Sequence, residues 1–211
     1  GLLLEVKREK FVPAQHQALA FADMEIPIGH GEAMMQPKVE ARILQELAVG
    51  PEESVYEVGT GSGYLTALLA RRGVHVVHCP RSHAYFRHEA FPHEELLRAR
   101  VNLCVGTDSL ATVLKRRKQR VELNLFAELQ ALANAVPGLW PDALLRMVTV
   151  NAAAALGLQG RAGELRPGAW ADLIAVPYAG PVRRVEEALV QHPGPVATSL
   201  IGGRWVVLPK R

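Results

Sequence analysis

Cysteine is scarce in this chain of 211 residues, which has only Cys79 and Cys104. Two cysteines are too few for the disulfide framework of a small secreted protein. The sequence also has no charged-then-apolar leader and no apolar stretch long enough to span a bilayer. We therefore expect a cytoplasmic protein that has no membrane partner.

A strong excess of one charge sign is also absent, because 24 lysines and arginines stand against 21 aspartates and glutamates. Much of the small basic excess lies in residues 115–120, a run without an aromatic side chain that could stack on a base. A solvated loop is the favoured interpretation of this run, and a phosphate or nucleic-acid site is the alternative. We expect no nucleic-acid partner. With 49% hydrophobic residues, the chain has the composition of an ordinary globular domain.

Hydrophobic periodicity predicts alternating helices and strands in the first half of the chain. Residues 37–48 have the pattern of an amphipathic helix, with Pro37 in its first turn. Strands are predicted at residues 54–58, 74–78 and 101–105, with a helix after each of the first two. Because such connections cross over right-handed, the predicted fold class is α/β, with a short parallel Rossmann-like sheet and flanking helices.

The second half of the chain changes character toward its end. A loop with Pro80 and Pro92 is expected after the second strand, and two helices are expected at residues 125–136 and 141–156. The C-terminal part predicts two or three β-strands, with Gly202-Gly203 as a tight hairpin turn. The three tryptophans are interpreted as packing residues: Trp140, Trp170 and Trp205.

Gly59, Gly61 and Gly63 lie between the first predicted strand and the helix after it. Glycines at such a turn let the backbone approach a ligand and direct the first helical N–H groups toward it. The pattern indicates a nucleotide-like cofactor, with a purely structural turn as the alternative. The acidic residue that usually holds the ribose hydroxyls is missing, because residues 58–88 contain no Asp or Glu. Arg81 in this region would suit a 2′-phosphate, so an NADP-type site is a further alternative.

The segments before residue 73 carry one recurring pattern. It consists of Phe11-Val12-Pro13, Leu19-Ala20-Phe21-Ala22-Asp23, Pro27-Ile28-Gly29-His30-Gly31, Gln36-Pro37 and residues 57–64. Together they resemble the N-terminal third of a protein-L-isoaspartate O-methyltransferase, and the resemblance runs from about residue 9 to residue 72. It implies that S-adenosylmethionine contacts the glycine turn and that the substrate side contains His30 and Gly31. The implied cofactor contacts are Glu57, Gly59, Thr60, Gly61, Ser62 and Gly63.

This resemblance has two departures. Met34-Met35 stand where many members of the family have a small hydroxyl residue. The second strand does not end in an acid, and the family's later motifs are absent after Arg72.

A different pattern begins at Val74. It consists of residues 78–83, 105–109, 147–153 and 163–173, the last of which reads Gly-Glu-Leu-Arg-Pro-Gly-Ala-Trp-Ala-Asp-Leu. These segments are similar to the C-terminal part of a metal-dependent amidohydrolase of the branch that deaminates purine-type nucleosides. The resemblance implies that Asp108 meets a zinc ion and the attacking water, and that His78 and Ser82 lie near the substrate. Only the last two of the eight strands of such a barrel are present, so the remaining zinc ligands are absent.

Several histidines lie close together in the sequence after the second strand. They are His75, His78, His83, His88 and His93, with Cys79 among them. Their spacing places them on no shared face of a helix or strand. A polar loop is the favoured interpretation, and adventitious metal binding is the alternative. For Asp108 the alternative to a ligand role is a helix N-cap or turn residue.

Both resemblances end near residues 72–73, which indicates a chimera. We expect residues 1–72 to be a methyltransferase-like half and residues 73–211 an amidohydrolase-like fragment, joined in one compact unit. The predicted function is S-adenosylmethionine binding without a complete catalytic set, and any activity would be O-methyl transfer. The alternatives are a metal-dependent hydrolase remnant and a folded chimera without activity. Strand edges left unpaired by the fusion predict a homo-oligomer.

Overall fold

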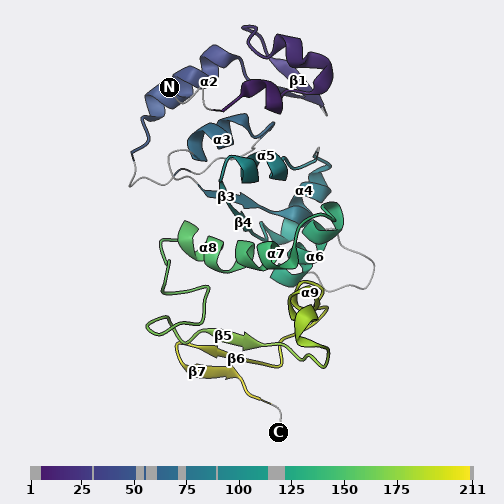
Figure 1. Ribbon diagram of the computed structural model, residues 1–211, viewed down its shortest axis with the longest axis vertical. Coiled ribbons are helices and arrows are strands. Elements are labelled where there is room, and N and C mark those ends of the chain that lie inside the picture. The colour runs from purple at the N-terminus through teal and green to yellow at the C-terminus, as the bar shows by residue number, and fades with distance from the viewer. Residues whose placement is uncertain are drawn as a thin grey trace. The chain divides into compact units, whose positions relative to one another are not determined.

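The computed structural model shows a chain of short helices and small sheets (Figure 1). It describes residues 6–29, 31–50, 55, 61–70, 75–88, 90–113 and 122–209. The chain forms two compact units, unit 1 with residues 1–76 and 87–103 and unit 2 with residues 77–86 and 104–211. These units are defined by contacts and not by ancestry, so they do not test the predicted segments 1–72 and 73–211.

Unit 1 consists of short helices around one antiparallel hairpin. Its elements are the 3-10 helices η1 (Arg8–Phe11) and η2 (Ala14–Leu19), strands β1 (Ile26–Gly29) and β2 (Glu32–Met34), and helices α2 (Pro37–Leu47), α3 (Tyr64–Ala70) and α5 (His93–Arg98). Helix α2 confirms the helix predicted at residues 37–48, and Pro37 occupies its first turn. The chain leaves α2 at Ala48, which has a left-handed backbone with φ 42°. Val49 and Leu69 form a small buried cluster beside the helix.

A buried ion pair links the first elements of unit 1. The guanidinium of Arg8 pairs with the carboxylate of Glu40, and both side chains are at most 2% exposed. Arg8 also donates to the backbone oxygens of Ala20 and Met35, each at 2.6 Å. Its guanidinium lies 5.0 Å from the ring centre of Tyr64. Because Arg8 contacts groups from η2, α2 and α3, it fixes these elements around one charge.

Strands β3 (His75–His78) and β4 (Asn102–Val105) form a two-stranded sheet. The amide side chain of Asn102 lies 2.7 Å from the ring of His75, and Gly106 N donates to His78 O at 2.9 Å. Since equivalent ends lie together, the two strands run parallel. Apart from Val55, the strand predicted at residues 54–58 lies outside the described residues. The structure confirms a mixed α/β fold with small sheets.

Unit 2 contains one helix between β3 and β4 and the helices described after β4. The first is α4 (Pro80–Phe86), and the others are η3 (Leu110–Thr112), α6 (Leu125–Ala135), α7 (Pro141–Val148), α8 (Val150–Ala155), η4 (Val182–Arg184) and α9 (Val185–Val190). Helix α6 confirms one prediction, whereas α4 corrects the loop expected around Pro80. Proline suits the first turn of a helix because its missing N–H has no partner there. Proline therefore marked the start of a helix at this position.

The helix predicted at residues 141–156 is divided into α7 and α8 at Thr149. Thr149 has φ −123° and ψ −99°, and its hydroxyl donates to Leu145 O at 2.7 Å. The backbone of Gly163 runs so close that a Cβ there would lie 2.6 Å from Thr149 O. This approach allows only glycine, and it places the loop at the break between the two helices.

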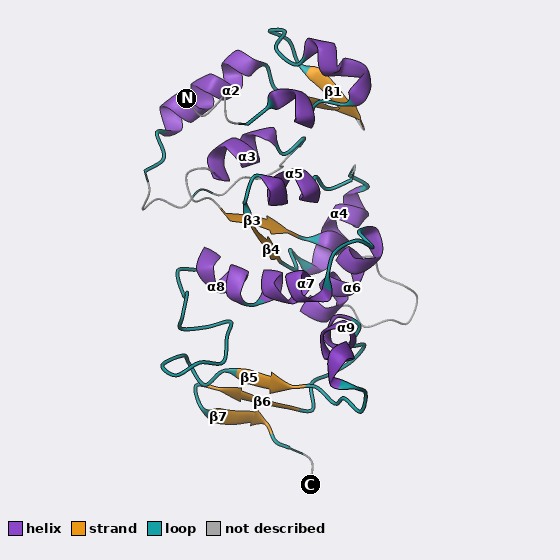
Figure 2. Cartoon of the chain, in the orientation of Figure 1, coloured by secondary structure: helices purple, strands orange, loops and turns teal. Residues whose placement is uncertain are grey.

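The C-terminal end of unit 2 is a three-stranded antiparallel sheet in the order β5 (Leu173–Ala175), β6 (Thr198–Ile201) and β7 (Arg204–Val207). Figure 2 shows β7 as the outermost of the three strands. Gly202 and Gly203 join β6 to β7 with φ values of 55° and 75°, as a type I′ hairpin turn requires. The predicted strands and their glycine turn are thus confirmed.

The interpretation of the three tryptophans as packing residues is wrong. Trp140 is 79% exposed, and Trp170 and Trp205 are 42% and 51% exposed. Trp170 lies instead against a charge, because the guanidinium of Arg161 is 4.9 Å from its ring centre.

Candidate functional site

The described part of the glycine turn in unit 1 is Gly61-Ser62-Gly63, directly before α3. Both glycines have left-handed backbones, with φ 51° at Gly61 and φ 79° at Gly63. A Cβ at Gly63 would lie 2.8 Å from the Cγ atom of Pro92, so packing requires glycine there. Among the described residues beyond its chain neighbours, the nearest atom to a Cβ at Gly61 would be the Cδ1 atom of Ile28 at 3.7 Å, an ordinary contact distance. Gly61 therefore leaves room beside its backbone.

The first turn of α3 is tied to the body of unit 1. Tyr64 N donates to the hydroxyl of Ser62 at 3.4 Å. Tyr64 is 3% exposed, and its ring centre lies 5.5 Å from that of Phe11. Burial raises the pKa of Tyr64, so the phenol stays neutral at physiological pH. The glycine turn is thus anchored to the buried first residue of α3, Tyr64.

The remaining residues predicted for this site are only partly described. Glu57, Gly59, Thr60 and His30 lie outside the described residues. Gly31, the predicted neighbour of His30, lies in the turn between β1 and β2 with φ 81° and with no protein atom within 4 Å of an added Cβ. Their roles in binding cofactor and substrate stay predictions.

A second group of polar side chains lies where β3 and β4 end, in unit 2. We call Cys79, Ser82, Asp108, Thr112 and Glu128 the strand-end cluster. The Oδ2 atom of Asp108 accepts hydrogen bonds from Ser82 Oγ at 2.6 Å and from Thr112 Oγ1 at 3.0 Å. Asp108 itself has a left-handed backbone with φ 52°. Because Ser82 belongs to α4 and Thr112 to η3, the carboxylate of Asp108 joins these two helices.

Glu128 of α6 and Thr112 are the two members of the cluster that the sequence analysis did not predict, and Glu128 is the buried acid. Its side chain has no exposed surface, and its Oε2 atom accepts from Arg81 N at 2.9 Å. The guanidinium of Arg81 lies 3.6 Å from Oε1. Burial raises the pKa of Glu128, and the Arg81 amide and charge oppose that shift. One signal for Glu128 was available in the sequence: it is an acidic residue in a predicted helix, next to the apolar Leu129 and close to the apolar Leu132. The structure shows that both leucines are buried.

Both cysteines stay in the thiol form. Burial raises the pKa of Cys79, and it raises the pKa of Cys104 to about 11. The nearby charges of Asp108 and Glu128 also raise the pKa of Cys79. A raised pKa disfavours the thiolate, which is the nucleophile and the metal ligand. Neither cysteine is therefore prepared for nucleophilic chemistry.

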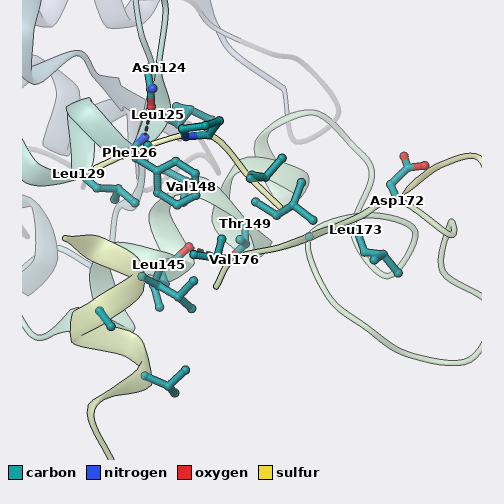
Figure 3. Close-up of a pocket in the computed structure, with 18 of the residues that line it drawn as sticks. Asn124, Leu125, Phe126, Leu129, Leu145, Val148, Thr149, Asp172, Leu173 and Val176 are labelled. Atoms are coloured by element: carbon teal, nitrogen blue, oxygen red, sulfur yellow. Dashed lines mark hydrogen bonds between the residues drawn. The ribbon is translucent and has the colours of Figure 1, made fainter. Parts of the chain in front are cut away.

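A pocket of about 1030 Å³ lies wholly within unit 2, between α6, α7, α9 and the C-terminal sheet (Figure 3). Apolar side chains such as Phe126, Leu145 and Val148 dominate its lining. Three of its polar side chains are engaged inside the protein. Asn124 Oδ1 caps α6 by accepting from Phe126 N and Ala127 N, Thr149 donates to Leu145 O, and Asp172 accepts from Gly202 N. The pocket is thus apolar in character, and the sequence analysis did not predict it.

Comparisons with known proteins place most of the chain in one family. The model of the amidohydrolase family matches residues 47–206. The chain belongs to the amidohydrolase family. In addition, the model of the protein-L-isoaspartate(D-aspartate) O-methyltransferase family matches residues 1–79. Models of both families therefore match parts of the chain, which confirms the predicted chimeric composition. The two matches overlap at residues 47–79, which include the predicted junction.

Curated relatives of both kinds are similar to parts of the chain. A 5-methylthioadenosine/S-adenosylhomocysteine deaminase from Teredinibacter turnerae is 37% identical over 117 residues, 52% of this chain and 25% of the relative. A protein-L-isoaspartate O-methyltransferase from Methylorubrum populi is 42% identical over 101 residues, 48% of this chain and 47% of the relative. The chain thus spans half or less of the length of these relatives.

Deaminases are among the solved structures that match. An adenosine deaminase from Xanthomonas campestris with bound zinc gives a TM-score of 0.67 and 27% identity, covering 94% of this chain and 44% of that chain. Guanine deaminase from E. coli gives a TM-score of 0.57 over 68% of this chain and 36% of that chain. The fold is accordingly of the amidohydrolase type, and these neighbours do not favour a Rossmann-like sheet.

The described residues of this chain do not fit a zinc ion. A catalytic zinc needs three protein ligands and an open position for water. In the described ranges, no three His, Cys, Asp or Glu side chains are close enough together to hold a metal. His78 is buried beside His83, with ring centres 5.0 Å apart, and Asp108 is bonded to two hydroxyls. The zinc implied by the family therefore has no site among these residues.

The remaining predictions concern the surroundings of the protein. In the part of the chain that the structure describes, no helix is both long and apolar enough to cross a membrane. The basic run at residues 115–120 lies outside the described residues. The expectations of a cytoplasmic location and of no nucleic-acid partner stay predictions.

Proposed function

We propose that this chain binds adenosine compounds with sulfur at the 5′ carbon, S-adenosylmethionine and S-adenosylhomocysteine, at its glycine turn. The matched methyltransferase family supports S-adenosylmethionine as a ligand. A deaminase relative of the other segment is named for 5-methylthioadenosine and S-adenosylhomocysteine. Loss of the methyl group from S-adenosylmethionine leaves S-adenosylhomocysteine, so relatives of both segments handle one chemical class.

The observation that carries this proposal is that packing against the described residues does not explain the glycine at position 61. Its left-handed φ of 51° favours glycine, and among the described residues beyond its chain neighbours the nearest atom to an added Cβ is Cδ1 of Ile28 at 3.7 Å, an ordinary contact distance. Gly63 has a packing reason to be glycine, whereas Gly61 has only the backbone reason. Backbone at such a turn can approach a ligand closely and offer it N–H groups. The hydroxyl of Ser62 accepts a hydrogen bond from Tyr64 N, and Gly63 packs against Pro92, so both residues hold this backbone at the start of α3.

The finer arrangement of the sheet belongs to the same proposal. We propose that the parallel pair β3 and β4 belongs to a Rossmann-like sheet. Apart from Val55, the strand predicted at residues 54–58 lies outside the described residues. The ribose acid of such a site is missing, because β3 ends at His78 and is followed by Cys79, Pro80 and Arg81. We therefore expect weak binding without the full specificity of a methyltransferase.

The chain carries out neither parental reaction in this proposal. The described residues offer no set of zinc ligands for hydrolysis. On the methyltransferase side, only the first 79 residues match that family. Binding of the cofactor, and not catalysis, is the function left by the residues present.

Calorimetric titration of the metal-free protein with S-adenosylmethionine and S-adenosylhomocysteine tests this proposal. Gly61→Val adds a side chain beside the backbone of the turn. Gly168→Val is the matched control, since Gly168 has φ 88° and, among the described residues beyond its chain neighbours, no atom within 4 Å of an added Cβ. We expect saturable one-site binding for the wild type and for Gly168→Val, and none for Gly61→Val. Absence of heat with the wild type at millimolar ligand would overturn the proposal, as would equal binding by both variants.

A further inference from the structure

The pocket of unit 2 includes neither the glycine turn, which belongs to unit 1, nor any described member of the strand-end cluster. Its volume of about 1030 Å³ lies near the upper limit for pockets that hold drug-sized ligands. Apolar side chains line it from each surrounding helix, among them Phe126 of α6, Val148 of α7 and Leu189 of α9. The size and the lining indicate a site for a small molecule with an apolar body.

Direct contacts join the walls of this pocket. Gln130 of α6 donates to His192 O, just after α9, at 2.7 Å, and the ring centre of Phe126 lies 4.9 Å from that of His192. Strand β5, which contributes Leu173 and Ile174 to the lining, pairs with β6 along its whole length. Because hydrogen bonds and packing hold these walls, the pocket is formed before a ligand enters, and binding does not have to order them.

Three polar side chains of the lining are bonded within the protein. Asn124 caps α6, and the hydroxyl of Thr149 donates to the backbone of α7. The hydroxyl of Tyr178 donates to Pro181 O at 2.7 Å. A polar ligand body would give up its hydrogen bonds to water without replacement at these groups. The lining thus favours a carbon body without polar substituents.

The charged side chains of the lining are all of one sign. Glu164 and Asp172 line the pocket, and none of the described lining residues is Lys, Arg or His. Arg166 lies 3.4 Å from Glu164 and offsets part of its charge, whereas Asp172 accepts from a neutral backbone amide, Gly202 N. A carboxylate has about four lone-pair sites, so one hydrogen bond leaves Asp172 able to accept more. Such a lining attracts a cation and repels an anion.

We propose that the pocket of unit 2 binds a hydrophobic amine. Figure 3 shows Asp172 at one end of the lining residues, away from Phe126 and Leu145 at the other end. The carbon body of the amine lies among the apolar side chains, and its ammonium group lies at the Asp172 end. This site is independent of ligand binding at the glycine turn, so each of the two proposals can fail without the other.

Calorimetric titration with n-octylamine, n-octanol and n-octanoate tests the apolar body and the charge separately. The three probes share the same alkyl chain, and at neutral pH they carry a positive charge, no charge and a negative charge. We expect the amine to bind most tightly and the octanoate most weakly, with about a tenfold difference between them, since each exposed carboxylate contributes only a few-fold. Octanoate binding as tightly as octylamine would overturn the proposal, as would the absence of binding by all three probes.

Two variants locate the binding site. Asp172→Asn removes the charge but keeps an acceptor oxygen for Gly202 N, so octylamine should bind roughly threefold more weakly while octanol binding is unchanged. Ala188→Phe places a ring in the pocket and should weaken binding of all three probes. Ala135→Phe is its matched control, because Ala135 is an exposed alanine of α6 outside the lining, and it should bind like wild type.

Equal binding by Ala188→Phe and Ala135→Phe would overturn the proposal. An unchanged ratio of amine to alcohol affinity in Asp172→Asn would also contradict it. Asp172→Asn preserves the shape of the side chain, so this second comparison decides the matter even if Ala188→Phe does not fold.

Discussion

The glycine turn of unit 1 and the strand-end cluster of unit 2 differ in what their polar groups already bind. Gly61 leaves space beside a left-handed backbone, with the nearest side-chain atom 3.7 Å from an added Cβ. Asp108, by contrast, accepts hydrogen bonds from Ser82 and Thr112. A polar group can bind a ligand only if other groups of the protein do not already occupy it. The comparison favours the proposed ligand role of the glycine turn, and it shows that the carboxylate of Asp108 is engaged by Ser82 and Thr112.

The largest expected effect on stability comes from Arg8, whose guanidinium contacts Tyr64 directly after the glycine turn. Arg8→Ala leaves Glu40 buried without its partner, and breaking a buried pair in this way destabilises by about 3–5 kcal/mol. Denaturant unfolding should show this loss, together with loss of ligand binding at the turn. The double variant Arg8→Met, Glu40→Leu removes both charges and should recover most of the stability. If the double variant is as unstable as Arg8→Ala, the loss of stability in Arg8→Ala is not caused by the unpaired charge of Glu40.

Comparing Gly63→Ala with Gly61→Ala separates the packing role of Gly63 from the backbone role of Gly61. A Cβ at Gly63 meets Pro92 at 2.8 Å and also strains the backbone, so we expect a loss of about 2–3 kcal/mol. Gly61→Ala meets only the backbone strain and should lose about 1 kcal/mol. Thermal unfolding of the two variants checks this order. Equal losses would show that the turn has no open side at Gly61.

Asp108→Ala tests whether the strand-end cluster is structural. It removes the acceptor of two hydroxyl hydrogen bonds, and we expect a loss of about 1–3 kcal/mol in the free energy of unfolding. Asp108→Asn keeps an acceptor oxygen and should lose less. Metal analysis after dialysis against zinc should find no stoichiometric zinc in wild type or in either variant. Zinc bound to wild type and lost in Asp108→Ala would instead support the metal-dependent hydrolase alternative.

Glu128→Gln should have the smallest effect, visible mainly as a change in pH dependence. Burial raises the pKa of Glu128 above its unfolded value, so the folded state binds more protons. Stability from this group is present below the unfolded pKa and decreases as pH rises from that value through the folded pKa. The amide side chain introduced by this substitution does not titrate, so the variant should gain stability relative to wild type over that range. Unfolding curves at several pH values measure the difference, and a constant difference would contradict it.

Much of the fold could be predicted from local patterns. Helix α2 followed from its apolar spacing and Pro37, and the β6–β7 hairpin followed from Gly202-Gly203. The start of α4 was missed because Pro80 was taken as a loop signal, although proline also suits a first helical turn. The break at Thr149 was missed because it depends on Gly163, which lies far along the sequence.

The candidate sites divide in the same way. The glycine turn was visible because its residues are adjacent in the sequence. The ligand role of Asp108 came from resemblance, but its partners Ser82 and Thr112 are brought to it by tertiary structure. Glu128 lies 47 residues from its partner Arg81, so no local pattern connects the two. Long-range hydrogen bonds decide which polar residues are already engaged, and a single sequence does not display them.

The most direct test of the central claim is a map of where S-adenosylhomocysteine binds. Backbone amide NMR spectra of the labelled protein, recorded with and without this ligand, distinguish the two regions. The account predicts shifts at Gly61, Ser62 and Gly63, and unchanged signals at Ser82, Asp108 and Thr112. Shifts confined to the strand-end cluster or to the pocket of unit 2 would contradict it.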